Sequence, residues 1–288
     1  IGRIRPTTTH APMTTINPFD AAEILDGIRR WVEIETPTEA PAEVNKLADL
    51  VASGYRDLPA TVERIAGHSG CGDHLVARSS WGQDAPGILV LSHLDTVHPM
   101  GFIERLPFKV EGDVAYGPGI YDMKGGAYIA HHAFRALCAT VDRSPLGITH
   151  LFTSDEEIGS PTSRALIETE GRKAKHVLVT EPARDGGKIV TGRKGVGRFE
   201  VFIKGVPAHA GTRPEDGRSA IRELANVIHA LEAMNDLKRG VTVNVGVVRG
   251  GTRPNVTPEE AYAEVDLRVP SIADSDEFVA RILALTSK

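Results

Sequence analysis

The chain contains few of the residues that build disulfide scaffolds or nucleic-acid surfaces. Only two cysteines occur among its 288 residues, Cys71 and Cys138, and their spacing is not that of a thiolate metal site. Aromatic residues make up 5%, and the formal net charge of −5 gives no general attraction to phosphate backbones. We therefore expect neither a disulfide framework nor a nucleic-acid partner.

Long apolar runs are also absent from the sequence. No segment approaches the roughly 20 apolar residues of a membrane-spanning helix, so we expect no membrane association. Residues 1–12 are rich in threonine and proline and lack the apolar core of a secretory signal. We interpret residues 1–12 as a leader or cloning remnant, with Met13 as a possible natural start, and expect a cytoplasmic location.

What remains is a composition suited to two globular domains. At 288 residues and 41% hydrophobic, the chain is long enough for a sizeable core. In residues 13–194, apolar runs alternate with helical patterns, one of them starting at Asn17; the runs are 87–91, 148–152 and 177–180. Strands that alternate with helices predict an α/β domain whose mostly parallel sheet is flanked by helices.

The pattern changes in residues 195–288. Apolar and polar residues alternate in three segments, which predicts half-buried strands at 199–203, 241–247 and 261–269. Helical patterns occupy 221–231 and 278–283. This order is a split βαβ unit without its last strand. We therefore expect an α+β domain with an antiparallel sheet, and a chain that is incomplete at its C-terminus.

Side chains that favour metals stand where the apolar runs of the first domain end. The run ends read Ser92-His93-Leu94-Asp95, Ser154-Asp155-Glu156-Glu157 and Thr180-Glu181-Pro182, and a glycine-rich turn reaches Asp122. Ligands of open α/β sheets bind just outside the carboxyl ends of the strands, so these side chains are expected to share one crevice. Histidine with carboxylates suits zinc, and a shared carboxylate suits a two-metal hydrolase.

His93 and Asp95 are two residues apart on an extended segment, so their side chains leave the same face. This arrangement lets His93 bind a metal while Asp95 orients its ring, although such a pair is also ordinary at a strand end. His98 is a competing histidine ligand. Glu181 follows an apolar run, and a buried acid there needs a partner that a cation would provide.

The remaining acids have structural alternatives as well. Asp122 resembles a helix N-cap, but Gly125 and Gly126 in the first turn of that helix indicate close backbone approach to another group. Glu156 and Glu157 are adjacent and cannot face the same way, so one can bind metal while the other acts as general base. The alternative for the two glutamates is a solvated acidic run.

Taken together, four ordered motifs resemble the co-catalytic di-zinc exopeptidase family. That family includes bacterial glutamate carboxypeptidases, which are the most similar, with acetylornithine deacetylases, succinyl-diaminopimelate desuccinylases and aminoacylases. The motifs are His93–Val97, Gly117–Gly126, Asp155–Ser160 and Thr180–Pro182. The resemblance implies that residues 13–194 are the N-terminal part of a zinc-binding catalytic domain and that residues 195–288 are an inserted lid or dimerisation domain.

The resemblance also implies roles for the strand-end residues. Two zinc ions per complete active site would be bridged by Asp122. His93 and Glu181 would complete the protein ligands of one ion, and Glu157 would hold the other. Glu156 would be the general base. Asp95 matches the acid that supports the histidine.

In residues 195–288, His209 matches the histidine that stabilises the tetrahedral oxyanion, often across a homodimer formed through this domain. Asn255 and Arg268 match substrate contacts, and a guanidinium suits a substrate carboxylate because it binds bidentately. The last zinc histidine of the family belongs to a later stretch, and residues 269–288 contain no histidine. We therefore expect the ion held by Glu157 to lack one ligand in this chain.

The expected function is a zinc-dependent metallopeptidase or amidohydrolase. It would cleave an amide or peptide bond next to a free carboxylate, as a carboxypeptidase or an N-acyl amino acid deacylase does, through a metal-activated water. The substrate would be a small peptide or an N-acyl amino acid, and cobalt or manganese would also suit the carboxylate-rich site. The alternative is a non-catalytic metal-binding or dimerisation module, because the last zinc histidine is absent.

Overall fold

A computed structural model describes residues 20–139, 144–184 and 186–287. The chain forms two compact units, which divide between Ala183 and Arg184. The domain boundary predicted at 194/195 lies directly before the first strand of the second unit. The predicted leader, residues 1–12, and the predicted helix start at Asn17 lie outside the described residues.

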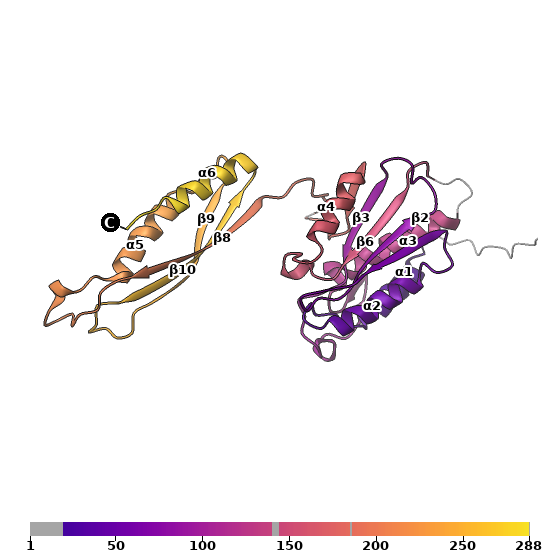
Figure 1. Cartoon of the computed structure of the whole chain (residues 1–288). Coiled ribbons are helices and arrows are strands. Elements are labelled where there is room, and N and C mark those ends of the chain that lie inside the picture. Colours follow the sequence, from indigo (N-terminus) through magenta and orange to yellow (C-terminus); the bar gives the residue numbers. More distant parts are fainter. Residues whose placement is uncertain (1–19, 140–143, 185, 288) are drawn as a thin grey trace, which may run out of the picture. The chain divides into compact units, whose positions relative to one another are not determined.

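The described residues of the first unit form a five-stranded sheet and four α-helices (Figure 1). In spatial order the strands are β1 (Ala60–Ile65), β2 (His74–Ser79), β6 (Ile148–Thr153), β3 (Ile88–His93) and β7 (His176–Val179). The helices are α1 (Ala21–Val32), α2 (Pro41–Ser53), α3 (Gly125–Ala139) and α4 (Arg164–Lys173). A separate hairpin pairs β4 (Lys109–Glu111) with β5 (Val114–Tyr116), and short helical turns span Phe102–Glu104, Ile120–Lys124 and Glu156–Ile158.

The predicted α/β class is confirmed, but the sheet is mixed rather than mostly parallel. β3 runs parallel to both β6 and β7, whereas β2 is antiparallel to β6 and to β1. The apolar runs seen in the sequence are the three parallel strands, whereas β1 has no such run and β2 has only a three-residue run, Leu75–Ala77. The carboxyl ends of β3, β6 and β7, which precede the acidic motifs, lie at one edge.

Apolar residues of the sheet alternate between two covered faces. One face packs against α1, α2 and α3 through a cluster that includes Trp31, Tyr55, Leu75, Ala77, Phe134, Ile148 and Phe152. The other face packs against α4, with Val76, Leu89, Leu151, Leu166 and Ile167 in contact. Figure 1 shows α4 on the side of the sheet away from α1 and α2. Successive residues of each strand therefore point into different layers.

Helix α1 begins at Ala21, because Asp20 caps its first turn. The Asp20 Oδ1 atom accepts hydrogen bonds from the backbone nitrogens of Ala22 and Glu23, both at 3.0 Å.

No described helix is both long enough and apolar enough to cross a lipid bilayer.

The second unit is the α+β domain that the sequence predicts. It comprises β8 (Gly195–Lys204), α5 (Ala220–Glu232), β9 (Thr242–Gly250), β10 (Glu260–Val269) and α6 (Ile272–Leu283). The three strands form an antiparallel sheet in the order β8-β10-β9. Inward-facing residues pack under the two helices in clusters that include Leu224, Leu231, Val243, Ala263, Val265, Leu267 and Phe278. The opposite face carries the exposed Phe202.

The turn before α3 differs from the predicted N-cap. Helix α3 begins at Gly125, and Asp122 has an extended backbone, with φ −124° and ψ 99°. Because Asp122 stands three residues before Gly125, it does not occupy the N-cap position, which is the residue directly before the helix. The glycines have the expected cause: a Cβ atom on Gly126 would lie 1.9 Å from the carbonyl oxygen of Thr180. The start of α3 therefore packs directly on the segment that carries Glu181.

We predict that Gly126→Ala destabilises the protein although alanine favours helices. The helix propensity of alanine would add about 1 kcal/mol, but overlap with the Thr180 carbonyl is expected to cost more, for a net loss of about 1–3 kcal/mol. Urea denaturation measures this change. Gly171→Ala in α4 is the matched control, because its Cβ atom would have no neighbour within 4 Å. Equal effects of the two substitutions would contradict the close packing.

Candidate active site

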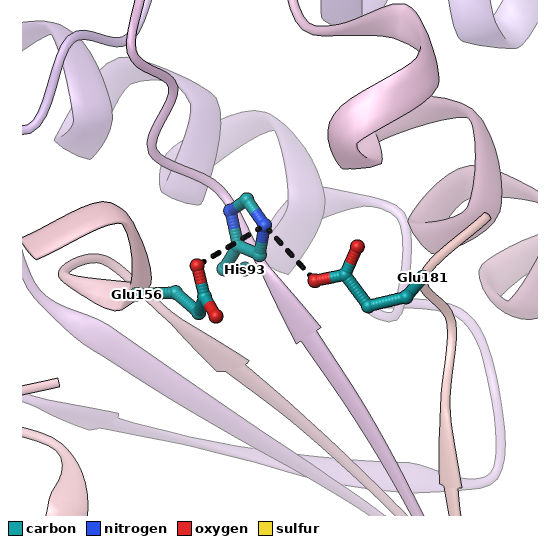
Figure 2. Close-up of side chains that lie close together, drawn as sticks. All are labelled: His93, Glu156 and Glu181. Atoms are coloured by element: carbon teal, nitrogen blue, oxygen red, sulfur yellow. Dashed lines mark ion pairs between the residues drawn. The ribbon is translucent and has the colours of Figure 1, made fainter. Parts of the chain in front are cut away.

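His93 ends β3 and is almost fully buried, with 1% of its side chain exposed. Its Nδ1 atom lies 2.9 Å from the backbone carbonyl of Asp95, which fixes the ring and leaves Nε2 free to act as a ligand atom. Nε2 lies 3.0 Å from Asp122 Oδ1, 3.6 Å from Glu181 Oε1 and 3.9 Å from Glu156 Oε2. Figure 2 shows Glu156 and Glu181 approaching the imidazole from opposite sides.

These side chains form two overlapping groups with the spacing of a metal site. His93, Glu156 and Glu181 make one group, and His93, Asp122 and Glu157 make the other; within each, the ligand atoms lie within 4.8 Å of one another. The structure therefore brings together the four predicted metal ligands and the predicted base. Each group contains one of the two adjacent glutamates.

The electrostatics of the cluster favour a cation. Burial lowers the pKa of His93, but hydrogen bonds to Asp122, Asp95 and Glu181 outweigh burial and raise it to about 12. Burial, with the nearby charge of Asp122, raises the pKa of Glu157 to about 7. Carboxylates that are crowded and partly buried resist ionisation, and a divalent cation among them removes that penalty. One imidazole with several carboxylates is a donor set that fits zinc.

Asp95 has a wider role than orienting the histidine. Its carboxylate is fully buried, and Oδ2 accepts hydrogen bonds from Thr38 Oγ1 at 2.8 Å and from the Glu157 backbone nitrogen at 3.1 Å. Oδ1 accepts from the Glu156 backbone nitrogen at 3.2 Å and lies 3.5 Å from His93 Nδ1. Asp95 thus joins the histidine to the turn that carries both glutamates. The contribution of Thr38 has no signal in the sequence.

Asp155, the first acid of the 155–157 run, supports the turn and does not face the cluster. Its side chain accepts hydrogen bonds from the backbone nitrogens of Thr162 and Ser163, at 2.6 and 3.0 Å, and from their hydroxyls, at 2.7 and 2.6 Å. These bonds close the loop that presents Glu156 and Glu157. The hydroxyl residues that follow the acids are the sequence signal for this loop.

The competing ligand His98 is directed elsewhere. Its ring stacks on Phe102, with ring centroids 4.6 Å apart and planes inclined by 7°. Among the described residues, no group with metal-ligand spacing includes His98.

Of the predicted residues in the second unit, two lie in neighbouring segments. The backbone nitrogen of Ala210 donates to the Asn255 carbonyl at 3.0 Å, which brings the His209 and Asn255 segments together. The exposed His209 accepts two backbone hydrogen bonds at Nδ1, from Gly211 and Thr212, both at 3.2 Å. An Nδ1 that accepts places the proton of the neutral ring on Nε2, which can then act as a donor.

Arg268 is placed apart from these two residues. It lies near the end of β10, eight residues beyond Glu260, which corresponds to roughly 27 Å of strand. Its guanidinium pairs with Asp266 through bonds of 2.7 and 3.0 Å. Within the second unit, the structure therefore does not join Arg268 to His209 and Asn255.

Comparison with known sequences gives matches that agree with the geometry. Residues 191–288 match the M20 peptidase dimerisation domain. Carboxypeptidase G2 from a Pseudomonas species is 33% identical over 255 residues, which cover 88% of this chain and 61% of that protein. A probable carboxypeptidase from Aspergillus terreus is 32% identical over 216 residues, 68% of this chain and 48% of that protein. The chain thus spans about half to three fifths of the length of these relatives.

Solved structures share the fold. Aminopeptidase PepT from Bacillus cereus superposes with a TM-score of 0.78 at 23% identity, covering 93% of this chain and 71% of that one. An M20 family metallo-carboxypeptidase from Sulfolobus solfataricus gives a TM-score of 0.67 at 17% identity, covering 91% and 74%. The resemblance inferred from the strand-end motifs is confirmed by these matches, and the chain is similar to M20 peptidases in both sequence and fold.

Proposed function

We propose that the protein is a metal-dependent exopeptidase that cleaves an amide or peptide bond next to a free carboxylate. The observation that carries this proposal is the convergence of His93 Nε2 with the carboxylates of Asp122, Glu156 and Glu181 beyond the carboxyl ends of parallel strands. Similarity to carboxypeptidase G2 supports a carboxypeptidase-like reaction over deacylation of N-acyl amino acids. The substrate would be a small peptide or a related N-acyl amino acid.

Similarity to M20 metallopeptidases supports a divalent metal, and we propose zinc, two ions per complete active site. The residues that would hold them are His93, Asp122, Glu157 and Glu181, with Asp122 shared. Cobalt or manganese would also suit these donors. When bound, zinc supplies a Lewis acid that polarises the substrate carbonyl and makes water acidic near neutral pH.

In this proposal Glu156 is the general base. Its carboxylate lies 3.9 Å from His93 Nε2, and its side chain is half exposed, so it can reach both the cluster and substrate. Glu156 would accept a proton from water as the water oxygen bonds to the substrate carbonyl carbon. It would return that proton to the leaving nitrogen as the carbon–nitrogen bond breaks. Asp95 would hold His93 and the Glu156 backbone in place throughout.

We propose that residues 195–288 are a lid and dimerisation domain. Residues 13–194 would be the catalytic part. The match to a peptidase dimerisation domain supports a homodimer. His209, with a proton on Nε2, would donate to the oxyanion, and Asn255 would contact substrate beside it. Arg268 would exchange its ion pair with Asp266 for an ion pair with the substrate carboxylate. No observation favours the alternative of a non-catalytic module.

The roles of the adjacent glutamates are separable in the full-length protein. We predict that Glu156→Gln lowers kcat about 10²- to 10⁴-fold, because the amide cannot accept a proton, while zinc content stays near normal. Glu157→Gln should instead reduce zinc content, because it removes a ligand charge. Steady-state hydrolysis of a dipeptide and elemental analysis measure the two effects. Full turnover by Glu156→Gln would exclude it as the base.

Zinc affinity of the 288-residue chain should rise with pH, because zinc displaces protons from its ligands. Below a pH of about 7, both Glu157 and His93 are protonated without metal, so zinc binding releases two protons. Above it, only His93 releases one. The logarithm of the affinity should therefore rise by about 2 per pH unit below this point and about 1 above it.

Competition with a chromophoric chelator at a series of pH values measures this dependence. Glu157→Gln serves as the matched variant, because it has no carboxyl group to titrate and should show a single slope. A zinc affinity of the unchanged chain that does not vary with pH would contradict the assignment of these ligands.

A further inference from the structure

Two hydroxyl residues stand directly before two of the proposed ligands. Ser92 precedes His93 at the end of β3, and Thr180 precedes Glu181 just after β7. Side chains alternate along a strand, so these hydroxyls point away from the ligand cluster and into the layer on the opposite face. Val90, two residues before Ser92, packs in that layer with the cluster under α1, α2 and α3.

The two hydroxyls belong to a chain of buried polar contacts. Ser92 Oγ lies 2.7 Å from Thr180 Oγ1 and 2.9 Å from His150 Nε2. His150 Nδ1 lies 3.0 Å from the hydroxyl of Tyr55. Ser92, His150 and Tyr55 are each 1% exposed. His150 comes from β6, so the contacts link β6, β3 and the segment after β7.

The hydrogen bonds have one consistent direction. Burial lowers the pKa of His150 well below its ordinary value, so the ring is neutral. The Tyr55 hydroxyl then donates to Nδ1, and the Nε2 proton is donated to Ser92. The Ser92 hydroxyl donates to Thr180, whose hydroxyl is 3.4 Å from the Leu91 carbonyl. This direction gives each hydroxyl and ring proton in the chain of contacts an acceptor.

The Ser92–Thr180 contact is the last link between β3 and the segment after β7 before the two proposed ligands. The ladder between β3 and β7 ends with the pair Leu91 and Val179, followed by one hydrogen bond from the Thr180 nitrogen to the Leu91 carbonyl. The side-chain contact is the next link, immediately before the two ligands. His93 Nε2 and Glu181 Oε1 are 3.6 Å apart on the other face.

We propose that His150, Ser92 and Thr180 form a positioning relay that holds the strand ends of His93 and Glu181 together at ligand distance. His150, fixed in β6, would donate a hydrogen bond to Ser92. Ser92 would in turn donate to Thr180 and so limit the movement of the segment after β7. A buried polar group is costly without a partner, so the bonded arrangement is favoured over separated strand ends. The inference rests on the proposed function only in taking His93 and Glu181 as metal ligands.

Substitutions at Thr180 separate the hydroxyl from the volume of the side chain. Thr180→Val keeps the volume and removes the hydroxyl, so we expect zinc affinity of the 288-residue chain to fall about 10- to 100-fold. Thr180→Ser keeps the hydroxyl and should bind zinc nearly as the unchanged chain does. Ser92→Ala should resemble Thr180→Val. Chelator competition measures each dissociation constant.

Ser79→Ala is the control for a merely structural effect. Ser79 is a buried, hydrogen-bonded serine of β2 in the same sheet, away from the cluster, and its Oγ contacts the Trp81 carbonyl at 2.8 Å. Its loss should lower the melting temperature without changing zinc affinity. Unchanged zinc affinity in Thr180→Val, or an equal loss in Ser79→Ala, would overturn the relay.

A second measurement separates this inference from the proposed function. The imidazole resonances of His93, followed by ¹⁵N NMR without metal, should shift in Thr180→Val and remain in place in Thr180→Ser and Ser79→Ala. If the unchanged chain binds no zinc, the proposed metal site fails, and these spectra still decide the relay. Identical His93 resonances in Thr180→Val and the unchanged chain would overturn it.

Discussion

The buried carboxylate of Asp95 is the point on which the candidate active site depends. It accepts hydrogen bonds from Thr38 and from two consecutive backbone nitrogens, at Glu156 and Glu157, while its own backbone carbonyl bonds to His93. One residue therefore determines the position of the imidazole and of the turn with both glutamates. Because buried carboxylates without partners are costly, the three donors also explain how this charge is tolerated.

The alternation of strand side chains divides the supporting structure into two layers. On one face, His93 and Glu181 point toward Asp122 and the adjacent glutamates. On the other, the preceding residues contact a neutral histidine among aromatic rings, with His150 stacked 3.8 Å from Phe152. Charged groups thus lie at the sheet edge and uncharged hydrogen bonds lie in the core. This separation keeps the mutual repulsion of the acids away from the packed layer.

Sequence patterns predicted the site residues whose position follows directly from the strand or turn that precedes them. His93, Asp122, Glu157 and Glu181 follow apolar strands or a glycine-rich turn, and parallel strands bring such ends together. Contacts between distant segments were not predictable in this way. Thr38 reaches Asp95 across 57 residues and Tyr55 reaches His150 across 95, and neither pair has a characteristic spacing. The antiparallel side of the sheet was missed because β1 has no continuous apolar run and the run of β2, Leu75–Ala77, is only three residues long.

The layered arrangement has a thermodynamic consequence for the cluster. The hydrogen bonds that position Glu156 and Glu157 involve their backbone atoms, so both carboxylates remain available to a ligand, with His93 as the nearby positive group. Burial, with a further contribution from the neighbouring carboxylates, raises the pKa of both glutamates. A cation that binds only the folded chain recovers the cost, contributing about 2.7 kcal/mol at a concentration 100 times its dissociation constant. Backbone atoms and buried neutral groups therefore hold the proposed ligands in place. The carboxylates stay available to bind a cation.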